Sequence, residues 1–161
     1  MGSRRRINLL GRAMNNSIFW TIVVGVIVFA ASQYVLKLIL EPITSFRRTL
    51  SDISSTILFH QARITNARPD DAISQELKRL SASLRAGMNE IRFYGFLSEL
   101  RIFGIPPRAR IREACRELNL VSHAMSPVSR EIEPSKNKDW PSENTRAIYR
   151  IGELLGVSTS Y

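Results

Sequence analysis

The chain has 161 residues, enough for about one domain, so two domains flanking a large active-site cleft are excluded. Its 23 Lys and Arg residues exceed the 14 Asp and Glu residues, and the net charge of +9 suggests an anionic partner such as a lipid headgroup surface. The single cysteine excludes an intramolecular disulfide, which is a weak sign of a reducing compartment.

The first predicted element is a transmembrane helix over Ile18–Leu40, preceded by a basic N-terminal tail at 1–17. At about 1.5 Å of rise per residue, this run is long enough to cross a hydrocarbon core of about 30 Å. Trp20 and Tyr34 lie where the aromatic belts of the two interfaces are expected. A cleaved signal peptide and a buried core helix are the alternatives. We favour the span because the apolar run is almost unbroken and resumes after Ser32.

The orientation of this span depends on which methionine starts the protein. By the positive-inside rule, the arginines of the tail place the N-terminus in the cytosol, by a narrow margin over Lys37, Arg47 and Arg48. A start at Met14 would remove the tail arginines and reverse the prediction. We expect Lys37 to reach the interface, and Arg47 and Arg48 to contact anionic lipid headgroups if they lie on the cytosolic side.

One polar amide, Gln33, lies within the predicted span. A polar group in lipid commonly pairs with another helix, and small residues such as Gly25 allow close approach. Gln33 and Gly25, with Ala30 and Ser32 nearby, are therefore candidates for helix–helix association. The alternative is that Gln33 simply lies at the interface beside Tyr34.

The segment 41–125 is predicted to be a helical domain. Pro42 follows the span and either kinks a continuous helix or lies in the first turn of a new one. Apolar residues then recur at helical spacing in two stretches separated by breakers at 66–69, and Asp70 and Asp71 suit the start of the second helix. The two stripes predict an antiparallel hairpin. The first is Ile43, Phe46, Leu50, Ile53 and Ile57; the second is Ile73, Leu77, Leu80, Leu84, Met88 and Ile91.

Further helices are predicted over Phe93–Phe103 and Arg108–Met125. The Arg108–Met125 helix has an apolar face of Ile111, Ala114, Leu118, Val121 and Met125. The proline-containing stretch 126–141 is predicted to be a loop. A last helix over 142–156, with Ser142 as N-cap and Gly156 as C-cap, completes an all-α fold.

The chain offers few residues suited to catalysis. Cys115 and His123 are eight positions apart, about 12 Å along one helix, so they cannot bind one ion or form a nucleophile pair unaided. His60 would have to fold onto Cys115 to help. We expect a buried or boundary Cys115, an exposed His123, and no metal or cofactor. The sequence therefore predicts a protein that is not an enzyme, with an enzyme of unrecognised type as an alternative.

The densest basic cluster is a candidate anion-binding face. Arg108, Arg112 and Arg116 would align along one side of a helix, as in surfaces that bind phosphate groups. Glu113 and Glu117 lie close in sequence and would partly neutralise them. We favour a solvated, salt-bridged face, and a nucleic-acid partner is disfavoured.

The residues around Leu36–Ile43, with the Glu-Pro-Ile turn followed by Arg47 and Arg48, resemble those of a set of small bacterial single-pass membrane proteins of unassigned function. The later helices, Ile111–Met125 and Ile148–Leu155, are loosely similar to helices of that set. The resemblance implies a bacterial inner-membrane protein with a short uncharged tail, which favours a start at Met14 and a cytosolic domain. It implies no activity, and the arginines of the tail depart from its pattern.

The sequence therefore predicts a single-pass, membrane-anchored helical protein that acts as a binding, scaffold or assembly module. Its expected partners are the lipid bilayer and either a second copy of the chain or another membrane protein. A membrane-tethered protein that binds nucleic acid or anionic lipid is the alternative.

Overall fold

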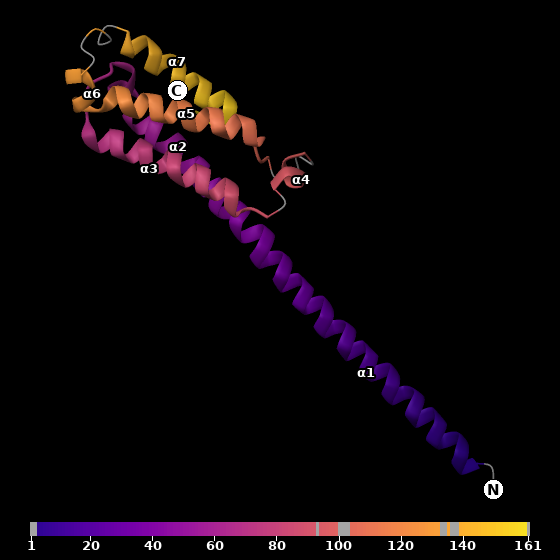
Figure 1. Cartoon of the computed structure of the whole chain (residues 1–161). Coiled ribbons are helices and arrows are strands. Elements are labelled where there is room, and N and C mark those ends of the chain that lie inside the picture. Colours follow the sequence, from indigo (N-terminus) through magenta and orange to yellow (C-terminus); the bar gives the residue numbers. More distant parts are fainter. Residues whose placement is uncertain (1–2, 93, 100–103, 133–134, 136–138, 161) are drawn as a thin grey trace. The chain divides into compact units, whose positions relative to one another are not determined.

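The computed structural model describes residues 3–92, 94–99, 104–132, 135 and 139–160, with side chains described from residue 18 onward, except at position 96. Every regular element in these ranges is a helix, which confirms the predicted all-α class. The chain divides into unit 1, Met1–Leu40, and unit 2, Glu41–Tyr161. Figure 1 shows the helices coloured along the sequence.

Unit 1 consists of α1 (Ser3–Val35) and the π-helical segment η1 (Leu36–Leu40). The widened helix has a local cause, because Pro42 lacks the N–H that would bond to the Leu38 carbonyl, and its ring crowds that carbonyl. A π-turn accommodates such a defect without ending the helix. The side chains of the tail arginines lie outside the described residues: Arg4, Arg5, Arg6 and Arg12.

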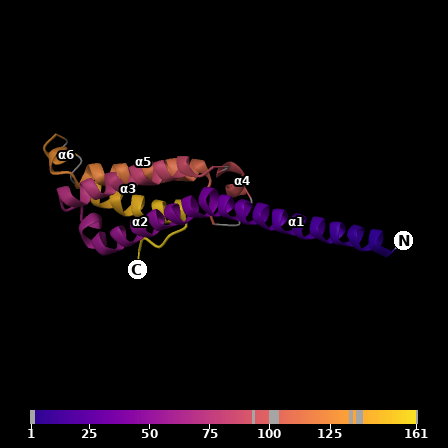
Figure 2. The same cartoon turned by 90° about the horizontal axis from the view of Figure 1, so that it is seen from below.

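Four longer helices form unit 2. They are α2 (Glu41–Thr65), α3 (Asp71–Glu90), α5 (Arg108–Met125) and α7 (Trp140–Leu155). α3 packs most extensively on α5 and also contacts α2, while α7 contacts both α5 and α2. Two short helices, α4 (Tyr94–Glu99) and α6 (Pro127–Ile132), lie at opposite ends of this unit in both Figure 1 and Figure 2. Each long helix thus has two helical neighbours around one core.

The core of unit 2 consists of the apolar stripes that the helical spacing predicts. All five residues of the α2 stripe are buried, and so are the predicted apolar faces of α3 and α5. The apolar residues of α7 are buried as well: Ile148, Ile151, Leu154 and Leu155. Leu118 is an example at the centre of α5, with no exposed surface. Burying a side chain of this size stabilises a fold by about 1.5–3 kcal/mol, so these stripes supply most of the driving force.

Two of the predicted helix ends are confirmed and one is wrong. Asp70 is the N-cap of α3, and its Oδ1 accepts a hydrogen bond from the Ile73 N–H at 3.2 Å. Gly156 is the C-cap of α7, with a left-handed φ of 67°. Ser142, however, does not cap α7: the helix begins at Trp140, and the Ser142 hydroxyl donates to the Asp139 carbonyl at 2.7 Å.

The earlier start of α7 has a physical reason. Trp140 is one of the largest fully buried side chains. Its burial in the core stabilises a helical turn that begins at Trp140, two residues before Ser142. Pro141 is compatible with that turn, because a first-turn residue needs no N–H.

The region predicted to be a loop, 126–141, contains α6, which is a correction to the prediction. Pro127 is the first residue of this helix, a position that proline favours because its φ is already helical. The helix predicted over Phe93–Phe103 is present from Tyr94 to Glu99. Position 93 and positions 100–103 lie outside the described residues.

Small polar residues join α3 to α5. The Ser74 hydroxyl donates to the Ser122 carbonyl, and the Ser122 hydroxyl donates to the Ser74 carbonyl, each at 2.8 Å. One heptad along, the Ser81 hydroxyl donates to the Cys115 carbonyl at 3.2 Å, and the Cys115 thiol is directed back to the Ser81 carbonyl at 3.5 Å. Small side chains let the two backbones approach closely enough for these reciprocal bonds. They fix the register of the antiparallel pair.

Two contacts tie α7 to its surroundings. The side-chain amide of Asn144, which is fully buried, donates to the Ile64 carbonyl at 2.8 Å, near the C-terminal end of α2. Beyond the helix, the Thr159 hydroxyl donates to the Ile148 carbonyl at 2.9 Å. A Cβ at Gly152 would lie 2.6 Å from the Thr159 hydroxyl oxygen, so the tail packs on α7 only because position 152 is glycine.

Candidate functional site

The apolar surface of α1 is the most unusual surface of unit 1. Within the described residues, one helix is long and apolar enough to cross a membrane, and the candidate span starts at Ile18. None of the residues in its most apolar window is buried. Val24, Ile27 and Phe29 are 55%, 61% and 66% exposed. This surface is large, continuous and without a protein partner in the described chain.

The three residues predicted to contact lipid headgroups lie on different elements. Lys37 is exposed on η1, while Arg47 and Arg48 are exposed on α2. The Arg47 guanidinium lies 3.6 Å from the position that a Cβ on Gly104 would take, and Arg47 lines a hollow of about 350 Å³ with the C-terminal tail. The Arg47 side chain therefore lies beside Gly104 and the C-terminal tail of unit 2.

The candidates for helix–helix association do not lie in one line along α1. On a helix of about 100° per residue, Gly25 and Ser32 lie about 20° apart, whereas Gln33 lies about 80° from Gly25. The Ser32 hydroxyl donates to the Val28 carbonyl at 2.8 Å, so its hydrogen bond is made within the helix. A Cβ at Gly25 would meet nothing within 4 Å. Gly25 and Gln33 thus mark two edges of a broad face.

The structure divides the predicted arginine cluster. The Arg108 guanidinium lies over the ring of Tyr94, 5.3 Å from its centroid. Tyr94 is buried and donates its hydroxyl hydrogen to the Pro106 carbonyl, and burial raises the pKa of the phenol. Arg108 is thus held by a cation–π contact at the start of α5.

The other two arginines of the cluster, Arg112 and Arg116, meet a third arginine from α3. Arg85, Arg112 and Arg116 line one pocket of about 310 Å³ between α3 and α5. The remaining lining residues are Met88, Ile111, Cys115 and Asn119. No carboxylate is present among these lining residues. None of the ion pairs between described residues includes one of these three arginines.

The acidic residues of α5 face the other way, toward α7. Glu113 accepts hydrogen bonds from both Nε and Nη2 of Arg150 on α7, at 3.1 and 2.7 Å. This bond is the main reason that the pKa of Arg150 is raised. Glu117 lines a groove between α5 and α7. Glu113, which was expected to partly neutralise the arginine face of its own helix, thus forms its ion pair across the helix interface.

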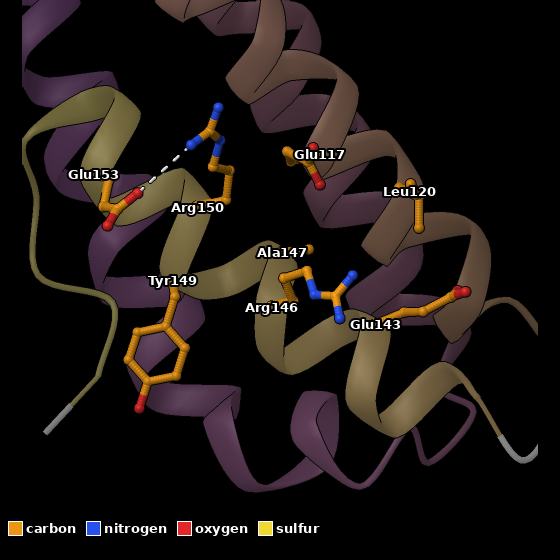
Figure 3. Close-up of a pocket in the computed structure, with 8 residues that line it drawn as sticks. All are labelled: Glu117, Leu120, Glu143, Arg146, Ala147, Tyr149, Arg150 and Glu153. Carbon is orange, nitrogen blue, oxygen red and sulfur yellow. Dashed lines mark ion pairs between the residues drawn. The ribbon is translucent and has the colours of Figure 1, made fainter.

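The groove between α5 and α7 has a volume of about 670 Å³ and both signs of charge (Figure 3). Glu117 and Leu120 come from α5, and Figure 3 shows Glu143 and Arg146 extending toward them from α7. Arg150 also lies 3.7 Å from Glu153. Paired charges of opposite sign give this groove no strong net preference for an anion or a cation.

The residues considered for catalysis each have other contacts. Cys115 is buried, as predicted, and burial raises the pKa of its thiol, which is opposite to the change that activates a nucleophile. His123 is exposed, as predicted, with Nδ1 2.9 Å from the Ser129 hydroxyl oxygen. His60 is half-buried against Phe59. Among the described residues, no group of three His, Cys, Asp or Glu side chains could hold a metal ion.

Sequence reasoning missed Arg85. It lies directly after the buried Leu84, on a helix that carries charges of both signs, and its spacing resembles that of any solvent-facing residue. The available signal was the repeat of small residues seven apart, Ser74 and Ser81 on one helix and Cys115 and Ser122 on the other. That repeat predicts which faces of α3 and α5 approach, and hence that Arg85 lies near Arg112.

Comparisons with known proteins add no relative. No protein-family model matches the chain, and no curated protein or solved structure matches it significantly.

Proposed function

We propose that the chain is a single-pass membrane protein whose unit 2 is a binding or assembly domain rather than an enzyme. The observation that carries this proposal is the apolar surface of α1 from Ile18 onward, none of which is buried in its most apolar window. Exposed apolar patches on soluble monomers rarely exceed a few hundred Å². A bilayer is the solvent in which such a helix is stable, since all its backbone bonds are made within the segment.

The proposal places unit 2 at the cytosolic face of a bacterial inner membrane. Arg47 and Arg48 follow the end of the apolar run by seven and eight residues, and both are exposed. Each arginine near an anionic leaflet contributes about 1 kcal/mol of attraction. Lys37 would extend to the same interface.

Two features support binding rather than catalysis. The only thiol is buried and its pKa is raised, so it is poorly suited to nucleophilic attack. The surface of α1 carries Gly25, where a partner helix could approach closely, and Gln33, which could bond across to it. Self-association through the span is therefore part of the proposal.

Extraction of membranes with alkaline carbonate tests the anchor. We expect the wild-type chain to remain in the pellet and the double variant with Val24→Arg and Ile27→Arg to enter the supernatant, because each arginine at the centre of a span costs about 2.5–3.5 kcal/mol. The matched control is Phe59→Arg on α2, since Phe59 is an apolar residue of unit 2 that is 82% exposed. Equal retention of the double variant and the control would contradict the proposal.

A reporter fused after Tyr161 tests the orientation. We expect cytosolic reporter activity when translation starts at Met14, because Arg47 and Arg48 then dominate the charge balance. The same fusion started at Met1 measures how far the tail arginines oppose this orientation. Periplasmic activity from both starts would contradict the cytosolic placement while leaving the anchor intact.

A further inference from the structure

The two sides of α5 differ in how their charges are balanced. On the side facing α7, Glu113 is paired with Arg150. On the side facing α3, Arg112 and Arg116 share a pocket with Arg85, and no carboxylate is among the residues that line it. Among the described residues, the arginines on this side are therefore not balanced by a direct ion pair.

Three guanidinium groups around one pocket repel one another unless an anion lies between them. All three arginines are exposed. Like charges gathered at one pocket repel one another, so an occupant with two negative charges gains from all three arginines at once. Arginine is also the side chain best suited to hold the oxygens of a phosphate group, because its planar fork donates two parallel hydrogen bonds.

We propose that the pocket formed by Arg85, Arg112 and Arg116 binds a phosphate group, carried by a small molecule or by a lipid headgroup. Asn119, which also lines the pocket, adds an amide donor. Met88, Ile111 and the buried Cys115 supply an apolar wall for the carbon atoms attached to the phosphate. The site lies within unit 2 and goes beyond the proposed membrane anchor, since it does not require the span to be inserted.

The geometry favours a terminal phosphate group over a nucleic-acid duplex. A duplex is bound by arginines arranged along successive phosphates of a strand. Here the next arginine of the same helix side, Arg108, is held over the ring of Tyr94. The other two arginines of that helix side, Arg112 and Arg116, instead line a single pocket with Arg85 of α3.

Reactivity of Cys115 provides a local measurement, because it is the only cysteine and it lines the same pocket. The full chain in nonionic detergent is treated with neutral 4,4′-dithiodipyridine at constant ionic strength, while inorganic phosphate replaces chloride. We expect phosphate to slow the reaction several-fold in a saturable manner and to raise the melting temperature. No change in either quantity up to tens of millimolar phosphate overturns the proposal.

Substitutions assign the effect to the pocket. Each glutamine substitution removes a charge-assisted hydrogen bond to the phosphate, and such bonds contribute strongly to binding. We therefore expect Arg85→Gln, Arg112→Gln and Arg116→Gln each to weaken phosphate binding about tenfold or more. Arg112→Lys, which keeps the charge but loses the fork, should lie between Arg112→Gln and wild type. Arg68→Gln, an exposed site in the turn after α2, is the charge-matched control and should bind as wild type does. Equal weakening in this control overturns the proposal.

The melting temperature without phosphate separates a binding site from a structural role. Because the empty pocket holds mutually repelling arginines, the three glutamine variants should melt at the same temperature as wild type or higher in phosphate-free buffer. A binding site then shows itself as a loss of the phosphate-induced shift alone. A drop in melting temperature of equal size with and without phosphate would overturn the proposal.

Nanodiscs distinguish the two sources of the phosphate group. Discs containing phosphatidic acid, in buffer without free phosphate, are compared with discs of phosphatidylcholine alone. Slower reaction of Cys115 in the phosphatidic acid discs, lost in Arg85→Gln, identifies a lipid headgroup as the ligand. Protection by free phosphate but not by phosphatidic acid identifies a soluble phosphate compound. Protection by duplex DNA in the absence of any phosphate effect overturns the proposal.

Discussion

The two units of this chain are both helical and both rich in apolar residues, yet they handle those residues in opposite ways. In α1 the apolar side chains from Ile18 onward are spread all round the helix and are exposed. In unit 2 they form a stripe on each long helix, and the stripes are buried against one another. Leu118 and Ile27, fully buried and 61% exposed respectively, represent the two cases.

The difference shows that apolar content alone does not decide where a helix is stable. A helix with one apolar stripe can bury it against a neighbour and remain in water, whereas one that is apolar all round needs an apolar surrounding on every side. Unit 2 supplies its own surrounding through four helices. Unit 1 has no comparable partner among the described residues, which is why the bilayer is central to the proposed function.

The largest expected effect comes from truncating one apolar residue in each unit. Leu118→Ala should lower the free energy of unfolding of unit 2 by about 2–5 kcal/mol, because it leaves a cavity in a closed core. Ile27→Ala should leave that free energy unchanged. Urea unfolding of the full chain in detergent, followed by Trp140 fluorescence in a Trp20→Phe background, measures both. An equal loss in the two variants would break the comparison.

A pair of glycines makes the same contrast at a single methyl group. Gly152→Ala places a Cβ 2.6 Å from the Thr159 hydroxyl oxygen and should destabilise unit 2 by about 1–3 kcal/mol through overpacking. Gly25→Ala meets nothing within 4 Å and should leave the unfolding of unit 2 unchanged. The same urea titration reads both variants. Thr159→Gly removes the hydroxyl and also its hydrogen bond to the Ile148 carbonyl. If the clash with Thr159 is the cause, Gly152→Ala should therefore cost less stability in a Thr159→Gly background than in the wild-type chain.

A polar amide in each unit gives the next effect. Asn144→Leu removes the hydrogen bond from the Asn144 amide to the Ile64 carbonyl, which keeps its bond from the Ala67 N–H at 3.0 Å, and should destabilise unit 2 by about 0.5–1.5 kcal/mol. Gln33→Leu should not change that stability. Under the proposed self-association it should instead weaken dimers in detergent by about 1 kcal/mol, roughly fivefold in the dissociation constant. Cross-linking across a range of detergent-to-protein ratios tests this, and unchanged dimers would exclude Gln33 from the interface.

The smallest expected effect is the loss of stability of unit 2 at low pH. The pKa of Asp70 is lowered, first by the hydrogen bond from the Ile73 N–H and further by the Arg63 side chain. The carboxylate therefore stabilises unit 2 above its ordinary pKa, and this contribution is lost as the pH falls through the lowered value. The free energy of unfolding measured with urea should be constant from pH 7 to about pH 5 and should fall below about pH 4.

Asp70→Asn should reduce this acid dependence, since it removes the titrating group but keeps an N-cap side chain. Carbonate-resistant membrane retention of the chain should not depend on Asp70 at all. A variant that unfolds with an unchanged acid profile would show that other carboxylates, such as Glu76 beside Arg79, dominate the pH response.

The positions of the helices could be predicted because their causes are local. The 3.6-residue period of the apolar residues places α2, α3, α5 and α7, and the left-handed conformation at Gly156 ends α7 as expected for a glycine. Predictions failed where a distant contact outweighs a local signal. Ser142 has the side chain of an N-cap, but burial of Trp140 moves the start of the helix two residues earlier.

The candidate site was predicted less completely than the fold. Arg112 and Arg116 could be named as a pair because four residues make about one helical turn. The pocket they line depends on Arg85, and the direction of Glu113 depends on Arg150, and each of these partners belongs to another helix. A single helix shows which of its residues share a face, but not which face its neighbours cover.

By itself, the sequence determined that the regular elements of this chain are helices, that one helix is apolar on all sides, and that Asp70 caps the start of α3. These properties follow from periodicity, composition and hydrogen bonding within a few residues. Only the tertiary structure decided the register of α3 on α5 through Ser74 and Ser122, because it depends on how closely two backbones can approach. That register brings three arginines to one pocket without a carboxylate.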